Sequence, residues 1–238
     1  MSRKLTRQAI LIPIILLFLV IPGISPSLSW ASQPIRTTQK TIVIDPGHGG
    51  MDPGISSSQG LTEKEAVLEL ARRIAKILDS RYNVLLTRIT DTHLPPARRA
   101  GYANQNRADF FLSLHLHRRK SDQGTIFYFD GPAGNQPKRP GSWQDQPLSL
   151  QTESKKAAVL LAKIFQTGQT ALQFSVVPAP VPVLEGTLMP AVVVEPFSIS
   201  MLTAPGNQEV LLTRFAESIS RGVDLYIKTQ GRTPQSNK

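Results

Sequence analysis

Short apolar runs rich in β-branched residues alternate along this chain with segments whose apolar residues recur at helical spacing. The strand-like runs are Thr41–Asp45, Asn83–Thr87, Asp109–His115, Gly124–Phe129 and Ala191–Glu195. The helix-like segments are Thr62–Ser80, Pro95–Asn106, Thr152–Gln169 and Asn207–Lys228. This alternation predicts an α/β fold in which a single, mostly parallel sheet carries helices on both faces.

The remaining segments are less regular. Asp130–Leu150 is rich in proline and glycine, so we expect a long surface loop. Residues 176–182 are dense in proline and predicted to be extended, followed by a short strand at Val183–Leu184. The buried face of the last helix-like segment is expected to comprise Val210, Leu211, Phe215, Ile219, Val223 and Tyr226.

The first 31 residues have the pattern of a secretory signal peptide. Three basic residues precede the apolar run Ala9–Ile21, and Ser29 and Ala31 fit a small-x-small cleavage site. The apolar run is shorter than the roughly 20 residues that cross a bilayer. We therefore expect cleavage after Ala31, and the alternative is an uncleaved membrane anchor. Both place the rest of the chain outside the cytoplasmic membrane, in the periplasm or cell wall.

The net charge and the absence of cysteine limit which partners the chain can bind and which residues can hold a metal. The formal net charge is +10, of which three positive charges lie within residues 1–31, so 10 − 3 = +7 remains after cleavage. An exported basic chain suits an anionic cell wall; we expect no nucleic-acid partner, and membrane contact only through an uncleaved leader. The chain has no cysteine, so any metal must be held by histidine or carboxylate. One folded domain is expected over residues 41–229, between a polar connector (32–40) and a polar tail (230–238).

Three strand-like runs deliver chemically useful side chains to their carboxyl ends, where ligand sites of α/β folds lie. His48 follows the first run within a glycine-rich loop, His115 ends the third, and Glu195 ends the last. Each has an ordinary explanation when taken singly. His48 could be a loop residue with local hydrogen bonds, and Glu195 could pair with Arg88 or Arg98.

Two further residues belong to the candidate set. A capping box of Thr62 and Glu65 leaves Glu63 without a structural role and free to point at the glycine-rich loop. The alternative is an acid that only favours the helix dipole. His117 is expected on the same strand face as His115, and either could bind metal, although basic neighbours also suit His117 to a solvated polyanion patch. Two histidines and a carboxylate around an open position are the usual catalytic zinc set, and a further carboxylate can move the proton.

Five segments carry a resemblance to a known family: TIVIDPGHGGMDPG, GLTEKEAVLELARRIAKIL, NVLLTRITDT, ADFFLSLHLH and MPAVVVEPF, in this order. Together they resemble the zinc-dependent N-acetylmuramoyl-L-alanine amidases of the Amidase_3 type. The resemblance runs from about Thr41 to Tyr226.

This resemblance implies a role for each matched residue. His48, Glu63 and His115 would be ligands of Zn2+, Glu195 would be the catalytic acid and base, and Arg88 would order the site rather than react. The implied reaction is hydrolysis of the amide between N-acetylmuramic acid and L-alanine of peptidoglycan, for cell-wall remodelling or daughter-cell separation.

Two stretches depart from the family pattern. Leu116 and His117 stand where the family has a small residue and then asparagine, so His117 could contact a ligand or substrate, or compete for the metal. Residues 196–200 replace a glycine-containing stretch beside Glu195. Two other functions therefore stay open: a non-catalytic peptidoglycan-binding module, and another secreted zinc hydrolase such as a peptidase or deacetylase. The loop at 130–150 could be a lid or a contact for an activator protein.

Overall fold

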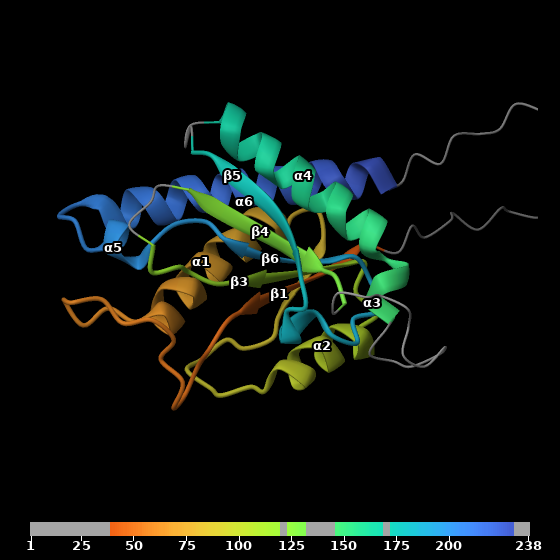
Figure 1. Ribbon diagram of the computed structural model, residues 1–238, viewed down its shortest axis with the longest axis horizontal. Helices are drawn as coiled ribbons and strands as arrows, with labels where there is room; N and C mark the ends of the chain where they lie inside the picture. The colour runs from red at the N-terminus through yellow and green to blue at the C-terminus, as the bar shows by residue number, and fades with distance from the viewer. Residues whose placement is uncertain (1–38, 120–122, 132–145, 169–171, 231–238) are drawn as a thin grey trace, which may run out of the picture. The chain divides into compact units, whose positions relative to one another are not determined.

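The computed structural model describes residues 39–119, 123–131, 146–168 and 172–230 (Figure 1). Within them, six strands form one sheet in the order β2-β1-β3-β6-β4-β5. The strands are β1 (Thr41–Pro46), β2 (Asn83–Leu86), β3 (Phe110–Leu114), β4 (Gly124–Phe129), β5 (Phe174–Ala179) and β6 (Ala191–Glu195). Every neighbouring pair is parallel except β4 and β6, which are antiparallel. The predicted α/β fold with a single, mostly parallel sheet is confirmed.

Helices cover both faces of this sheet, as expected (Figure 1). The helical elements are α1 (Glu63–Leu78), α2 (Pro96–Gln105), α3 (Gln146–Ser149), α4 (Gln151–Thr167), the 3-10 turn η2 (Pro182–Leu184), α5 (Ile199–Leu202) and α6 (Asn207–Gln230). Helices α1, α4 and α6 enclose the larger core on one face, while α2 and η2 enclose the smaller core on the other. No helix in the described part of the chain is both long and apolar enough to cross a membrane.

The two cores explain why the strand sequences are continuously apolar. Successive side chains of a strand point to opposite faces, so Ile42 and Ile44 enter the larger core while Val43 enters the smaller one. Phe110 and Phe111 of β3 divide in the same way. Each fully buried side chain of this size contributes about 1.5–3 kcal/mol by leaving water.

Several local expectations were wrong. Val183 and Leu184 belong to η2, a turn that starts at Pro182 and in which the N–H of Leu184 donates to the carbonyl oxygen of Val181. Proline has no N–H for a strand ladder, which favours a turn here. The short helices α3 and α5 were not predicted, and α3 lies in the range expected to be loop.

On α6, Val210 is 46% exposed, whereas Leu212 is buried. Val210 and Leu212 are two positions apart in the helix, which places them about 200° apart around its axis, so they cannot share one face. The buried face therefore runs through Leu212, Phe215 and Ile219.

Parts of the expected domain plan lie outside the described residues. These are the leader (1–31), most of the connector, residues 132–145 of the expected loop, and the tail beyond Gln230.

Three adjacent parallel strands bring their carboxyl ends together. In the register of the sheet, Pro46 of β1 lies opposite Leu114 of β3, and Leu114 lies opposite Val194 of β6. Backbone hydrogen bonds continue just beyond the strands, from Gly47 N to Leu114 O and from His115 N to Val194 O, each 3.0 Å long. The loops that carry the predicted site residues therefore begin side by side.

Candidate metal centre

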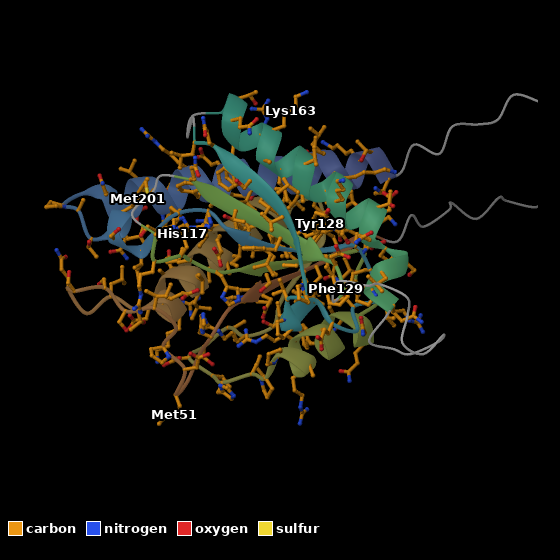
Figure 2. All side chains as sticks on the ribbon, in the orientation of Figure 1. Met51, His117, Tyr128, Phe129, Lys163 and Met201 are labelled. Atoms are coloured by element: carbon orange, nitrogen blue, oxygen red, sulfur yellow. The ribbon has the colours of Figure 1, made fainter. Side chains whose placement is uncertain are left out.

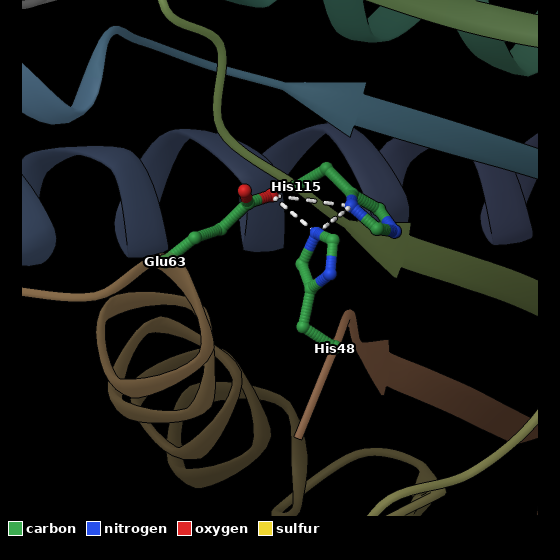
Figure 3. Close-up of side chains that lie close together, drawn as sticks. All are labelled: His48, Glu63 and His115. Carbon is green, nitrogen blue, oxygen red and sulfur yellow. Dashed lines mark hydrogen bonds and ion pairs between the residues drawn. The ribbon is translucent and has the colours of Figure 1, made fainter. Parts of the chain in front are cut away.

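The structure brings His48, Glu63 and His115 together at this edge of the sheet (Figure 3). The Nε2 atom of His48 lies 3.1 Å from Oε1 of Glu63, and Nδ1 of His115 lies 3.2 Å from the same oxygen. The two imidazole nitrogens are 3.2 Å apart. His48 comes from the loop after β1, Glu63 is the first residue of α1, and His115 directly follows β3.

The three donor atoms fit a zinc ion. Tetrahedral zinc bonded at about 2.0–2.1 Å requires neighbouring donor atoms about 3.3 Å apart. The observed sides of the triangle, 3.1, 3.2 and 3.2 Å, are close to that spacing. Two imidazoles and one carboxylate are also the donor types of catalytic zinc sites, so the residues present suit this metal.

His48 is held in an unusual backbone conformation. Its φ angle is +58°, in the left-handed region that residues with a side chain seldom adopt. Its Nδ1 atom bonds to Oδ2 of Asp52 at 2.8 Å, and the other oxygen of Asp52 accepts the N–H of Gly54. Burial lowers the pKa of His48, but hydrogen bonds to Glu63 and Asp52 outweigh it, so the net shift is upward.

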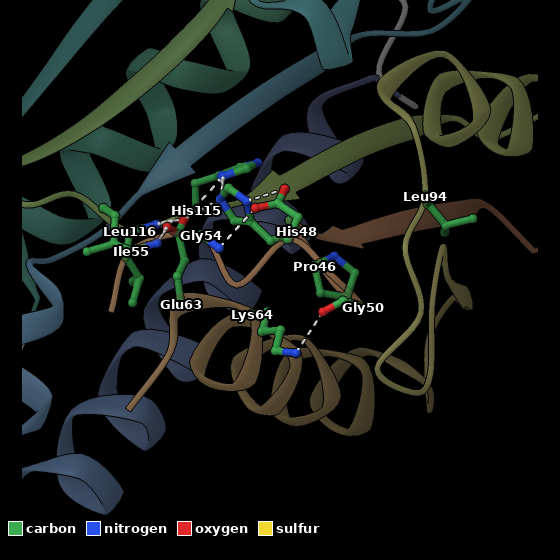
Figure 4. A network of polar contacts seen from close by, with 12 residues as sticks. Pro46, His48, Gly50, Gly54, Ile55, Glu63, Lys64, Leu94, His115 and Leu116 are labelled. Atoms are coloured by element: carbon green, nitrogen blue, oxygen red, sulfur yellow. Dashed lines mark hydrogen bonds and ion pairs between the residues drawn. The ribbon is translucent and has the colours of Figure 1, made fainter. Parts of the chain in front are cut away.

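Glu63 is almost fully buried and every hydrogen bond around it favours the ionised form (Figure 4). Oε1 accepts the backbone N–H of Leu116 at 2.8 Å, and Oε2 accepts that of Ile55 at 2.9 Å. Burial opposes ionisation, but the hydrogen bonds from both histidines and these backbone groups outweigh it and hold the pKa of Glu63 far below its usual range.

The helix start leaves Glu63 free, as predicted. The carboxylate of Glu65 accepts hydrogen bonds from the backbone N–H and the hydroxyl of Thr62, at 3.1 and 2.6 Å. Glu63 therefore has no part in capping, and its side chain faces the loop of His48.

Two glycines make room for the cluster. A Cβ atom on Gly47 would lie 2.4 Å from Cε1 of His115, and one on Gly54 would lie 2.6 Å from the ring of His48. Gly54 also has a φ angle of +64°. Side chains at these positions would displace the donors, which explains the glycines of this loop in physical terms.

Glu195 stands beside the cluster. It ends β6, one residue past the carbonyl that accepts the N–H of His115. Its Oε2 atom lies 3.5 Å from Nη2 of Arg119, so the pairing with Arg88 or Arg98 considered above is wrong. Partial burial raises the pKa of Glu195, and the positive charge of Arg119 counteracts part of that rise.

His117 lies apart from the three donors. His117, labelled in Figure 2, is 5% exposed, and burial together with the positive charge of Arg119 lowers its pKa. A solvated polyanion patch is therefore ruled out. Strand β3 ends at Leu114, so the strand alternation that put His117 on the face of His115 does not continue. The backbone of His117 instead pairs with Phe197 and Ile199, which both belong to the second departing stretch, residues 196–200.

Sequence reasoning missed a buried polar group beneath the loop. Asp45 is fully buried, and its carboxylate accepts bonds from the hydroxyls of Thr87 and Ser113 at 2.5 and 2.7 Å. The guanidinium of Arg99 donates to it at 2.8 Å. An acid at the end of an apolar run was the signal used for Glu195, and it applied equally to Asp45. Arg99 gave no comparable signal, because its helix is polar overall.

A mostly parallel sheet with two histidines and a glutamate converging at its carboxyl edge defines an α/β protein with a candidate metal centre of the hydrolase type. Residues 42–232 match the model of the Amidase_3 family, described as N-acetylmuramoyl-L-alanine amidase, and the chain belongs to this family.

Relatives and solved structures agree with this assignment. A 75-residue segment, 31% of this chain and 18% of the relative, is 45% identical to the N-acetylmuramoyl-L-alanine amidase AmiC of Neisseria meningitidis serogroup B. A segment of 141 residues, 52% of this chain, is 33% identical to the germination-specific amidase of Bacillus subtilis and covers 59% of it. The matches thus span less than two thirds of these curated relatives.

Among solved structures, the catalytic domain of the amidase CwlV from Bacillus (Paenibacillus) polymyxa var. colistinus superposes with a TM-score of 0.63 at 26% identity. That match covers 80% of this chain and 99% of the other. An amidase from Clostridium difficile 630 gives a TM-score of 0.60 at 26% identity, covering 81% and 99%.

Proposed function

We propose that this protein is a zinc-dependent N-acetylmuramoyl-L-alanine amidase, which hydrolyses the amide between N-acetylmuramic acid and the L-alanine of peptidoglycan. The observation that carries the proposal is the triangle of donor atoms from His48, Glu63 and His115 in a chain of the amidase family. Such an enzyme serves cell-wall remodelling or daughter-cell separation.

In this proposal, Nε2 of His48, Oε1 of Glu63 and Nδ1 of His115 would hold zinc. When bound, zinc supplies Lewis acidity, which polarises a carbonyl group and makes water a nucleophile near neutral pH. The protein's part is to fix the donors in advance. Asp52 holds the ring of His48, and two backbone N–H groups hold the carboxylate of Glu63.

Glu195 acts first as the general base and then as the general acid. Its carboxylate takes a proton from water as the new C–O bond forms at the lactyl carbonyl. It then gives this proton to the alanine nitrogen as the C–N bond breaks. The products are a lactyl carboxylate on the glycan and a free amino group on the stem peptide. Burial raises the pKa of Glu195, which suits a group that must both accept and release a proton.

We propose that the protein acts in the cell wall. Family membership supports action on peptidoglycan outside the cytoplasm, and the basic net charge favours an anionic polymer. We propose that the leader at 1–31 exports the chain to the periplasm or cell wall. A partner other than peptidoglycan, such as an activator protein, has no support in the described residues.

Digestion of purified sacculi tests the activity directly. The protein is incubated with sacculi, with and without a chelator, and the soluble products are identified by mass spectrometry. We expect intact stem peptides released from intact glycan, loss of release with the chelator, and recovery after zinc is added back.

The other candidate functions give different products. A peptidase would yield truncated stem peptides, and a deacetylase would release acetate while leaving the peptides attached. Protein that binds zinc and sacculi but releases nothing after long incubation would be a binding module.

A further inference from the structure

Two buried arginines hold the backbone of the loop that carries His48. Arg88 follows β2, and its Nε and Nη2 atoms donate to the carbonyl oxygens of Pro46 and Gly47 at 2.9 and 2.7 Å. Arg99, in α2, donates from Nη1 to the oxygen of Pro46 at 2.8 Å and from Nη2 to the oxygen of His48 at 2.7 Å. Three consecutive carbonyl groups, just where β1 ends, are thus bound by two guanidinium groups.

These bonds act where the backbone needs external support. The left-handed conformation of His48 is sparsely populated, and it persists only when the surroundings enforce it. Arg99 supplies such a restraint, because its Nη2 atom binds the carbonyl of His48 itself. The orientation of that peptide unit determines the direction in which the imidazole leaves the main chain.

Arg88 also joins the loop to the helix that carries Glu63. Its Nη2 atom donates to the carbonyl oxygen of Lys64 at 2.8 Å, in the first turn of α1. One guanidinium therefore contacts the backbone next to two of the three donors, His48 and Glu63. Because a guanidinium is planar and rigid, it fixes the distance between the groups that it binds.

Arg99 extends the same framework to the third donor. Its partner Asp45 accepts the hydroxyl of Ser113, which lies on β3 two residues before His115. The Arg99–Asp45 pair is buried on both sides, with side-chain exposures of 6% and 0%. A buried pair of this kind is weak evidence for a role in stability, because desolvation offsets most of its attraction, and in some proteins such pairs instead specify geometry.

We infer that Arg88 and Arg99 are positioning residues, which order the backbone of the metal centre before the metal binds. This inference rests on the proposed function only through the assignment of His48, Glu63 and His115 as ligands. The printed bonds of both arginines go to main-chain carbonyl groups, and those of Arg99 also to the carboxylate of Asp45, rather than to the three donor atoms.

The test compares zinc binding by the full chain, stripped of metal, with binding by the variants Arg88→Lys and Arg99→Lys. Lysine keeps the positive charge but lacks the fork that reaches several carbonyls at once. Arg72→Lys is the matched control, since Arg72 Nη2 donates to the carbonyl oxygen of Ile89 at 2.7 Å, outside the loop of His48. We expect titration calorimetry to give zinc affinities about 10–100-fold weaker for the two loop variants and unchanged for the control.

A purely structural role gives a different result. If both loop variants melted at lower temperature but bound zinc with the affinity of the unaltered chain, the arginines would serve stability alone and the inference would be overturned.

Hydrogen exchange of the unaltered, metal-free chain gives a second test if a variant does not fold. The N–H of Gly47 donates to Leu114 O and that of Gly49 to Asp52 O, so both should be protected before zinc is added. Exchange at the rate of an open peptide until zinc is added would overturn the pre-ordering.

Failure of the proposed amidase function can be distinguished from failure of the positioning role. A chain that binds zinc tightly yet releases no stem peptides would refute the amidase and leave the positioning role intact. Unchanged zinc affinity in His48→Ala would refute the ligand assignment, and the positioning role with it.

Discussion

The carboxylate of Asp52 accepts a hydrogen bond of 2.8 Å from Nδ1 of His48, four residues earlier in the same loop. An ionised carboxylate can only accept, so the bond places a proton on Nδ1, and Nε2, which faces Glu63, is the nitrogen that would bind the metal. Asp52 thus fixes the ring of His48, while Arg88 and Arg99 fix its backbone.

Replacing Asp52 should weaken metal binding without unfolding the protein. For Asp52→Ala we expect zinc affinity to fall about 10–100-fold, as is typical when the partner of a metal-binding histidine is removed. The melting temperature should change little, because 48% of the Asp52 side chain is exposed. Asp52→Asn keeps an acceptor oxygen and should lose less. Titration calorimetry measures the zinc affinity of the unaltered chain and of both variants. Equal zinc affinities for the alanine variant and the unaltered chain would contradict the role of Asp52.

Glu195→Gln should separate catalysis from metal binding. The amide keeps the size of the side chain but cannot take a proton, so we expect stem-peptide release to slow by about 10²–10⁴-fold. Zinc stoichiometry should stay the same, since Glu195 is not one of the three clustered donors. Glu217→Gln, an exposed position on α6, is the control for the substitution itself. Release from sacculi at close to the unaltered rate would show that Glu195 is not the general base.

The acid limb of the pH profile should depend on Arg119. Burial raises the pKa of Glu195, and Arg119 lowers it in part. The base form is lost as pH falls through this raised pKa. As pH is lowered, kcat/KM should therefore begin to decline at a pH above the ordinary glutamate pKa of about 4.3. Arg119→Gln removes the opposing charge, raises the pKa of Glu195 further, and should move the acid limb to higher pH.

Salt provides an independent check on that charge. The Arg119 side chain is 53% exposed, so salt screens it. Added salt should therefore shift the limb of the unaltered enzyme toward that of Arg119→Gln. An acid limb that stays in place or moves to lower pH in the variant would contradict this account.

Local patterns in the sequence predicted five of the six strands and the residues that cluster at the sheet edge, whereas β5 was expected only as part of an extended stretch at 176–182. Continuous apolar runs such as Ala191–Glu195 indicate strands buried on two faces, and parallel strands bring their carboxyl ends to one edge. The sequence predicted that Glu65, rather than Glu63, would bond to Thr62 in the capping box, and the structure has these bonds.

The remaining features depend on contacts between residues distant in sequence. Arg99 lies 54 residues from Asp45, and nothing local to α2 reveals that its guanidinium is buried. A solvated patch was one of the roles that the basic neighbours of His117 left open, but this residue is buried where its backbone pairs with Phe197 and Ile199. The two departures from the family pattern thus touch each other, which no reading of either stretch alone could reveal.

Two helical glycines should respond to alanine with opposite signs. Alanine normally stabilises a helix relative to glycine by about 0.5–1 kcal/mol. This gain is expected for Gly101→Ala in α2, where a new Cβ meets no atom within 4 Å. At Gly222 in α6, the new Cβ would lie 2.5 Å from Cδ2 and 3.2 Å from Cγ of Leu161, a fully buried residue of α4. Overpacking there should lower the free energy of unfolding by about 1–3 kcal/mol. Urea denaturation measures both changes, and an equally stable or more stable Gly222→Ala variant would show that α4 and α6 can move apart.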